Sequence, residues 1–184
     1  SGTKINVQNQ IIKIMYHAFR EVLPANKIYV YGHTSCGKLD YNRYNDDHDG
    51  ENTLIRVYNE PGVEKFDERI NSQLNNRLSN NHDGIAIEQV YNRIRSSNNE
   101  SILFIGISDG QPAGSGYGGE SAIQQMKRVI EKAKRDNYVT VGIGIQSPAV
   151  MGIYQYATVI NDLSEVPVKV SRILNDTVKR EFKE

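Results

Sequence analysis

The chain has 184 residues, the size of one domain with a sizeable buried core, and we expect a single domain over residues 1–184. Its 22 basic and 22 acidic residues balance, so its charge gives no indication of a nucleic-acid partner or an anionic membrane partner. Cys36 is the only cysteine, which excludes an intramolecular disulfide and favours a reducing compartment. No apolar stretch has the length of a membrane span, and no leader-like segment opens the chain, so we expect a cytoplasmic domain.

Three helices and two strands are predicted in the first half of the chain. Helical spacing of apolar residues predicts a helix over residues 5–23, ended by Pro24. Strands are predicted over residues 27–32 and 53–58, and helices over residues 64–74 and 84–95. The apolar face of the first helix is expected to comprise Ile11, Ile12, Met15, Phe19 and Val22. The inward face of the helix over residues 84–95 is expected to comprise Ile87, Val90, Tyr91 and Ile94.

A polar stretch from Cys36 to Asn52, rich in Asp, Asn and Tyr, separates the two predicted strands. Long segments without periodicity are usually functional or disordered. We therefore expect this stretch to be mobile in the free domain and to contact a partner when one is bound.

The second half of the chain contains the most apolar run, residues 102–107, which predicts a parallel strand buried on both faces. After a glycine-rich loop, the pattern predicts a helix over residues 120–135, strands over 139–145 and 157–160, and a final helix over 166–182. This alternation favours an α/β fold with three α/β/α layers and a mostly parallel, doubly wound sheet.

Asp109 directly follows the apolar run and precedes a Gly/Pro turn. Ligand groups gather at the carboxyl ends of strands in open α/β sheets. A carboxylate in such a place is costly unless it is hydrogen-bonded or faces a cation. Asp109 is thus a candidate ligand-binding residue, and the alternative is that it only caps a turn or a helix.

Two short motifs near Asp109 suggest enzymes. Gly106-Ile107-Ser108-Asp109-Gly110 matches the G-x-S-x-G nucleophile elbow, which requires a helix at once and a later histidine. All four histidines precede this segment, and we expect them to be ordinary surface or loop residues rather than a metal cluster. Gly114-Ser115-Gly116-Tyr117-Gly118-Gly119 matches G-x-G-x-x-G, but no acidic residue ends the next strand to hold a ribose. A flexible turn is the alternative interpretation of these glycines.

A third interpretation takes Ser108-Asp109-Gly110-Gln111-Pro112 as a unit. This segment resembles the S-D-G-x-P turn of von Willebrand factor A (VWA) domains. The resemblance extends to the Val141-Gly142-Ile143-Gly144-Ile145 strand and to Val159-Ile160-Asn161-Asp162-Leu163 before the last helix. Asn81-His82-Asp83-Gly84 is similar to the N-x-D-G segment of the cobaltochelatase-subunit branch of that family, although Asp83 also suits a helix N-cap.

The D-x-S-x-S motif of VWA domains is absent from this chain. Ser1-Gly2-Thr3-Lys4-Ile5 instead resembles the stretch that follows this motif. The resemblance therefore implies an N-terminally incomplete VWA-like domain without its first, central strand. Such a gap would leave the edges of two neighbouring strands unpaired, to be filled by an upstream segment or by another chain.

The resemblance also implies a function: a non-catalytic protein-interaction module with a partial metal-ion-dependent adhesion site. Asp109 and Asp83 would bind Mg²⁺ or another divalent cation, with Ser108 behind them, and binding would be weak or absent without the serines of the missing motif. Thr34, Ser35 and Gln111 are candidates for partner contact. The implied partner is a protein of the ring-shaped ATPase type. The alternative function is a nucleotide-binding or hydrolytic enzyme that uses residues 108–119.

Overall fold

A computed structural model describes residues 2–36, 52–71, 81–95, 101–114 and 116–181. The α-helices in these ranges are α1 (Gly2–Arg20), α2 (Phe66–Asn71), α3 (Asp83–Arg95), α4 (Gly119–Arg135) and α5 (Val166–Glu181). The strands are β1 (Val30–Cys36), β2 (Asn52–Glu60), β3 (Val63–Glu64), β4 (Ile102–Ser108), β5 (Ala113–Gly114), β6 (Tyr117–Gly118), β7 (Tyr138–Ile145) and β8 (Tyr156–Ile160). Short 3₁₀ turns are η1 (Ala25–Lys27), η2 (Pro148–Val150) and η3 (Leu163–Glu165). The α/β class is confirmed.

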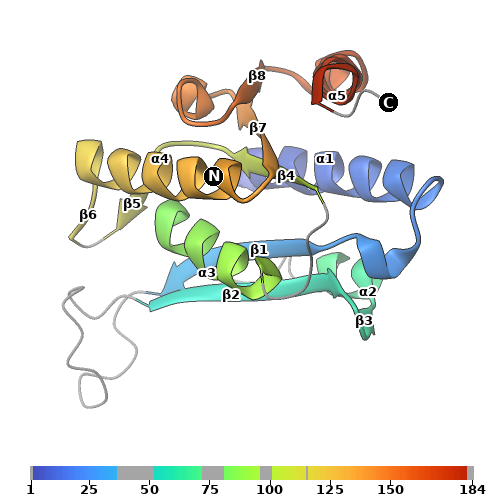
Figure 1. The fold of residues 1–184 in the computed structure, drawn as a ribbon, viewed down its shortest axis with the longest axis horizontal. Helices are drawn as coiled ribbons and strands as arrows, with labels where there is room; N and C mark the ends of the chain where they lie inside the picture. The colour runs from blue at the N-terminus through green and yellow to red at the C-terminus, as the bar shows by residue number, and fades with distance from the viewer. Residues whose placement is uncertain (1, 37–51, 72–80, 96–100, 115, 182–184) are drawn as a thin grey trace.

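The strands form separate sheets, as Figure 1 shows. Parallel strands have the order β4-β7-β8, antiparallel strands the order β1-β2-β3, and β5 pairs with β6 in a small hairpin. The expectation of one mostly parallel sheet was therefore wrong for the described strands. Gly62, with φ of +80°, lets the chain turn sharply from β2 into β3, so these two strands pair antiparallel.

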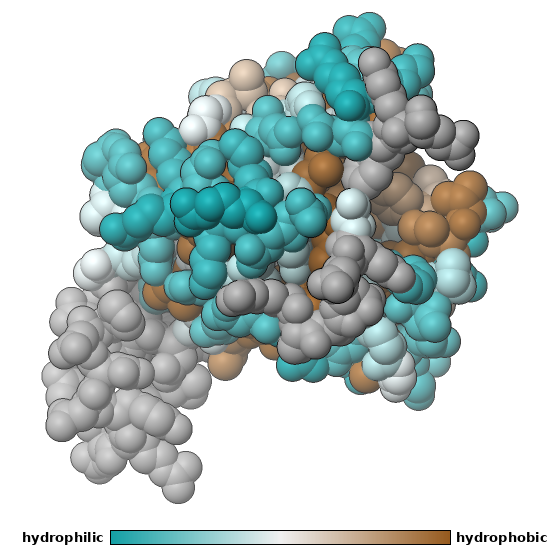
Figure 2. Space-filling model, in the orientation of Figure 1, coloured by the Kyte–Doolittle hydropathy of each residue, from teal (hydrophilic) through white to brown (hydrophobic). Residues whose placement is uncertain are grey.

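Helices pack on both faces of the parallel sheet. On one face, α1 and α5 contact the odd-numbered residues of β7, including Val141 and Ile143. On the other, Met126 and Ile130 of α4 pack with Val150 and its neighbours. The outward face of α4 is mostly hydrophilic in Figure 2, in keeping with its single apolar stripe. Continuous apolar strands between two helical layers are what the sequence pattern predicted for this part.

Helix α1 packs against both the parallel and the antiparallel sheet. Its residues Ile11 and Met15 join the core of the parallel sheet, whereas Tyr16 packs with Ile28 and Phe66 against the antiparallel sheet. The Tyr16 and Phe66 rings are stacked with centroids 3.9 Å apart. Helix α3 contacts β2 and β1 as well as α4. The two sheets are thus connected mainly through helices.

Strands β7 and β4 differ in burial. Every residue of β7 is buried, but every residue of β4 is only half-buried. The reason is position: β7 has a strand on each side, whereas β4 pairs only with β7 among the described strands. The expectation that residues 102–107 form a strand buried on both faces was therefore wrong in degree.

The free edge of β4 is partly covered by α1. The Ile102 amide donates to the Asn137 carbonyl, so the even-numbered residues of β4 point their backbone groups toward β7. The odd-numbered residues of β4 point their backbone N–H and C=O groups to the other edge, away from β7. There the Gln8 side chain donates to the Ile107 carbonyl at 3.2 Å. Strand β1 is also an edge strand, paired with β2 alone within the described residues.

Most predicted elements are present, with shifted ends. The first helix ends at Arg20, and Val22 lies beyond it with 77 % of its surface exposed, so its assignment to the apolar face was wrong. The first strand begins at Val30 and extends to Cys36, later than predicted. Residues 37–51, which make up most of the predicted polar stretch, and residues 72–80 lie outside the described part. No helix in the described ranges is both long and apolar enough to cross a membrane.

Candidate functional site

The turn after β4 is fixed by its own polar groups. The Ser108 hydroxyl donates to the Gly110 carbonyl at 3.0 Å and accepts from the Gly110 amide at 3.4 Å. Asp109 is half-buried at the top of this turn, and the Lys4 ammonium of α1 donates to its backbone carbonyl at 2.9 Å. The side chain of Ser108 is therefore already engaged, and a positive charge lies beside Asp109.

The segment before α3 is tied to the same turn. Asn81 and Ala113 exchange two backbone hydrogen bonds of 2.8 and 3.0 Å, and the Asn81 side chain donates to the Gln111 carbonyl at 3.3 Å. This pairing joins two segments that lie about thirty residues apart in the sequence. As a result, the start of α3, with Asp83, lies next to the loop that follows Asp109.

Asp83 is the buried acidic residue of this region, with 8 % of its side chain exposed. The His33 Nε2 of β1 lies 3.0 Å from one carboxylate oxygen, and the Asn81 amide donates to the other at 3.1 Å. Asp83 also begins α3, where the free amides of the first turn favour a negative charge. Both oxygens of Asp83 are thus engaged by groups of the chain itself.

A second layer of polar contacts surrounds the start of α3. The buried His82 pairs through Nδ1 with the Thr53 hydroxyl at 3.0 Å, and its ring lies 4.8 Å from that of Tyr117. The Tyr117 hydroxyl accepts from the Gly84 amide at 2.9 Å. Burial raises the pKa of Tyr117, so its hydroxyl stays protonated at neutral pH.

The histidines do not all match the expectation of surface or loop residues. His17 is exposed and pairs with Asp67 on α2 at 3.1 Å, as expected of a surface residue. His33 lies within β1 and contacts Asp83, so the expectation was wrong for His33. His82 lies in the loop before α3, as expected, but it is buried there. His48 lies outside the described residues. The predicted strand ended at Gly32, so the sequence analysis did not place His33 in a strand. Its contact with the start of α3 was therefore missed.

The three candidates for partner contact lie in different surroundings. Gln111 is exposed in the turn after β4. Thr34 and Ser35 are buried at the end of β1, and the Ser35 hydroxyl makes no hydrogen bond with a described residue. Gln111 is therefore accessible to a partner in this conformation, and contact with Thr34 or Ser35 stays a prediction that requires neighbouring segments to move.

The oxygen atoms of Asp109, Asp83 and Ser108 have the chemistry that Mg²⁺ prefers, but their arrangement does not fit the ion. No group of three or more His, Cys, Asp or Glu side chains in the described ranges is placed to hold a metal. The Asp83 oxygens and the Ser108 hydroxyl already have partners within the chain. These residues do not form a complete cation site by themselves.

The glycine-rich loop forms a hairpin between β4 and α4. Strands β5 and β6 pair within it, and Gly116 and Gly119 have left-handed φ angles of 67° and 59°. A nucleophile elbow requires a helix immediately after its serine, whereas here α4 begins only at Gly119. Gly116 and Gly119 thus serve sharp turns of the backbone.

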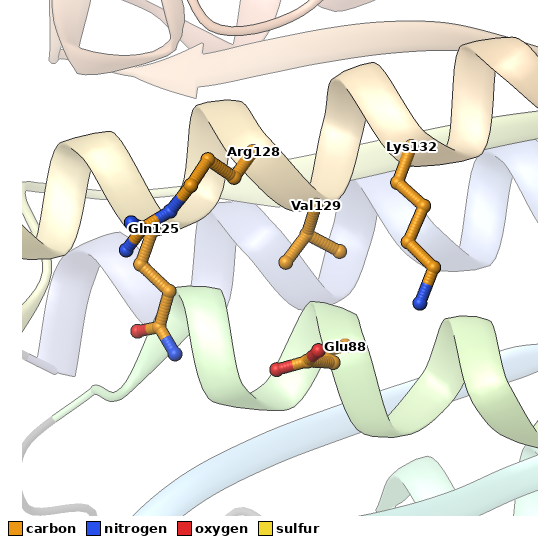
Figure 3. A pocket seen from close by; sticks show the side chains of 5 residues that line it. All are labelled: Glu88, Gln125, Arg128, Val129 and Lys132. Atoms are coloured by element: carbon orange, nitrogen blue, oxygen red, sulfur yellow. The ribbon is translucent and has the colours of Figure 1, made fainter.

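A hollow of about 310 Å³ lies between α3 and α4. Figure 3 shows the side chains that line it. They are Glu88, Gln125, Arg128, Val129 and Lys132. The Lys132 ammonium also lies 5.0 Å from the centroid of the Tyr91 ring, so it contributes to packing of the two helices.

No family model matches this chain, and no curated protein or solved structure matches it either. The similarity to VWA domains therefore rests on the sequence segments quoted above, and the site must be judged by its own geometry.

Proposed function

We propose that this chain is a non-catalytic protein-interaction module of VWA type, with the three-layer arrangement of that family. Its contact surface would be the polar loops at the carboxyl end of β4. A protein of the ring-shaped ATPase type would be the partner, and the location would be cytoplasmic. A divalent cation such as Mg²⁺ would add to this contact through Asp109 and Asp83 only weakly, because the described donors are too few.

The pairing of Asn81 with Ala113 is the observation that supports this proposal most. It brings the start of α3 and the turn after β4 together, so the exposed Gln111 lies beside the segment that carries Asp83. Loops held in place by a strand and a helix are suited to recognition, because little conformational entropy is lost when a partner binds. Half-buried edges on β1 and β4 are consistent with a domain that works within a larger assembly.

A binding measurement tests the proposal. Purified ring-shaped ATPases encoded in the same genome are titrated onto the domain, and the affinity is measured by calorimetry. Gln111→Arg changes an exposed side chain in the proposed contact surface and should weaken binding about tenfold, the effect of about 1.4 kcal/mol. Gln124→Arg, on the exposed outer face of α4, is the matched control and should leave the affinity unchanged.

Two results would contradict the proposal. Equal affinity of both variants would mean that the turn after β4 is not the contact surface. Absence of binding to every such ATPase would remove this class of partner. The cation component has its own test, because Asp109→Ala should reduce any stabilisation by Mg²⁺ while the unfolding temperature in EDTA stays nearly the same.

A further inference from the structure

The hollow between α3 and α4 brings charged side chains of both helices together. Arg128 and Lys132 line it from α4, one helical turn apart, and Glu88 lines it from α3. Figure 3 shows Lys132 at one end of the hollow and Arg128 at the other, with Glu88 between them. Neither Arg128 nor Glu88 forms a hydrogen bond or ion pair with another described residue. The lining of the hollow thus has two cations and a single anion.

Helix α4 as a whole is basic, although the chain has no net charge. Its acidic residues are engaged elsewhere: Glu131 pairs with Lys134 at 2.9 Å, and Glu120 accepts a hydrogen bond from Gln124. The basic residues of α4 outnumber these two, and they are Lys127, Arg128, Lys132, Lys134 and Arg135. The surface around the hollow therefore attracts anionic groups.

The walls of the hollow indicate the kind of ligand. Val129, with 6 % of its surface exposed, is the buried residue of the lining, and the other lining residues are exposed or half-buried. Small-molecule sites usually bury most of the ligand surface, which such open walls do not achieve. The anionic group must therefore belong to a larger partner that is also held by other contacts. Cations at both ends of the hollow suit several spaced carboxylates better than one compact phosphate.

The hollow adjoins the start of α3. A Cβ atom on Gly84 would lie 3.0 Å from the side-chain oxygen of Gln125, which lines the hollow. The Gly84 amide donates to the Tyr117 hydroxyl of the loop that follows Asp109. The hollow is thus continuous with the loops at the carboxyl end of β4, and one partner can contact both.

We propose that the hollow binds an acidic segment of a protein partner, whose carboxylates pair with Arg128 and Lys132 while their methylene groups pack on Val129. The inference rests on the proposed function only for the identity of that partner. Glu88 repels such a segment and limits its affinity. A long polyanion such as a nucleic acid is disfavoured, because it would meet Glu88 and Glu131 on a chain without net charge.

The test titrates a blocked hexaglutamate peptide onto the full chain at low ionic strength, where exposed charges are least screened. The NMR signals of the Gln125 and Val129 amides report on the hollow, and that of Gly110 reports on the turn after β4. Changing Arg128→Gln and Lys132→Gln together should raise the apparent Kd about fivefold, because exposed ion pairs contribute little each. Glutamine is a good helix former, so α4 should stay folded.

The matched control combines Lys127→Gln with Arg135→Gln. It also removes one lysine and one arginine from α4, but neither residue lines the hollow. The apparent Kd should stay within about twofold of the parent. Equal losses for the two double variants would mean that the peptide is attracted to the whole helix, and the inference would be overturned.

A change of opposite sign sharpens the test, because misfolding cannot produce a gain in affinity. Glu88→Gln removes the repelling carboxylate from the hollow and should lower the apparent Kd about twofold. Glu131→Gln makes the same chemical change on α4 outside the hollow and should have a smaller effect. Equal gains from both changes would count against a site in the hollow.

The outcomes keep this inference apart from the proposed function. If the peptide leaves the Gln125 and Val129 signals unchanged, the inference is overturned, and the titration of ATPases onto Gln111→Arg still tests the module. If the peptide binds in the hollow but no ring-shaped ATPase binds the domain, the inference stands and that class of partner falls. Tighter binding of an oligothymidylate than of the peptide at the same signals would overturn the acidic protein segment in favour of a nucleic acid.

Discussion

The parallel and antiparallel sheets of this domain are stabilised in different ways. In the parallel sheet, β7 is mostly apolar and is buried along its whole length, and its neighbours contact it by apolar packing. In the antiparallel sheet, polar side chains make the important connections: the buried Asn59 of β2 bonds to the carbonyls of Ala25 and Ile28, and Glu60 pairs with Arg93 of α3. The first sheet should therefore be sensitive to changes in volume, and the second to loss of single hydrogen-bonding groups.

The largest effect is expected where a backbone fits tightly in the parallel sheet. A Cβ atom on Gly144 would lie 2.0 Å from the backbone oxygen of Ser147, so Gly144→Ala requires the chain after β7 to move. We expect a loss of about 4 kcal/mol or failure to fold. Gly110→Ala is the matched control, because nothing lies within 4 Å of its added methyl group. Chemical denaturation of both variants checks this, and equal stabilities would show that the β7 turn is not tightly packed.

A somewhat smaller effect is expected at Asn59 in the antiparallel sheet. Its side-chain amide donates to the carbonyls of Ala25 and Ile28, and its oxygen accepts from the Tyr16 hydroxyl. Asn59→Ala leaves these buried groups without a partner and should cost about 3 kcal/mol in the free energy of unfolding. Asn6→Ala, on an exposed position of α1, should cost less than about 0.5 kcal/mol. A loss below 1 kcal/mol for Asn59→Ala would mean that packing alone holds this sheet.

The contrast between the sheets also explains what the sequence could predict. The apolar runs of residues 102–107 and 139–145 predicted the right elements, because burial leaves a continuous apolar run in the sequence. The strand pairing was not predictable in the same way. Whether β4 and β1 lie side by side in one sheet depends on which strands pair at their edges. No local sequence pattern encodes that pairing.

The candidate site was predicted only in part for a similar reason. Asp109 and Asp83 were found because acidic residues stand out at the end of a strand and at the start of a helix. Lys4, His33 and Asn81 were missed, since each acts on a group that is distant in sequence. An extension of the predicted strand beyond Gly32 would have indicated that His33 is not a loop residue.

A moderate, pH-dependent effect is expected at Glu60. Hydrogen bonds from Arg93, together with one from the Tyr31 hydroxyl, hold the pKa of Glu60 below its ordinary value, although partial burial opposes this. A lowered pKa in the folded state means that the stabilisation is complete above the pKa of the unfolded chain and is lost as the pH falls through the folded pKa. Glu60→Gln should thus cost about 1 kcal/mol at pH 7, because Arg93 is largely exposed, and nearly nothing at an acid pH below the folded pKa of Glu60.

The control for Glu60 is an exposed pair on α4. Glu131→Gln removes the contact with Lys134, which lies one turn away at 2.9 Å. Exposed pairs on one helix contribute little, so its effect should stay within about 0.5 kcal/mol at both pH values. If Glu60→Gln shows no more pH dependence than Glu131→Gln, the contact between α3 and β2 does not depend on the charge of Glu60.

The smallest effect is expected at Ser108, at the polar end of the parallel sheet, and it also separates the proposed module from the enzyme alternative. The Ser108 hydroxyl bonds only to the Gly110 backbone among its described contacts, in a half-buried turn that water reaches. Ser108→Ala should therefore cost about 0.5–1 kcal/mol, the usual value of one such hydrogen bond.

If the chain used residues 108–119 as a hydrolytic or nucleotide-binding loop, the same change would remove its nucleophile and abolish turnover. Unfolding curves and a nucleotide and ester hydrolysis assay on both proteins decide between these outcomes. Measurable hydrolysis by the parent that disappears in Ser108→Ala would favour the enzyme, because a lost turn contact of this size leaves nearly all molecules folded.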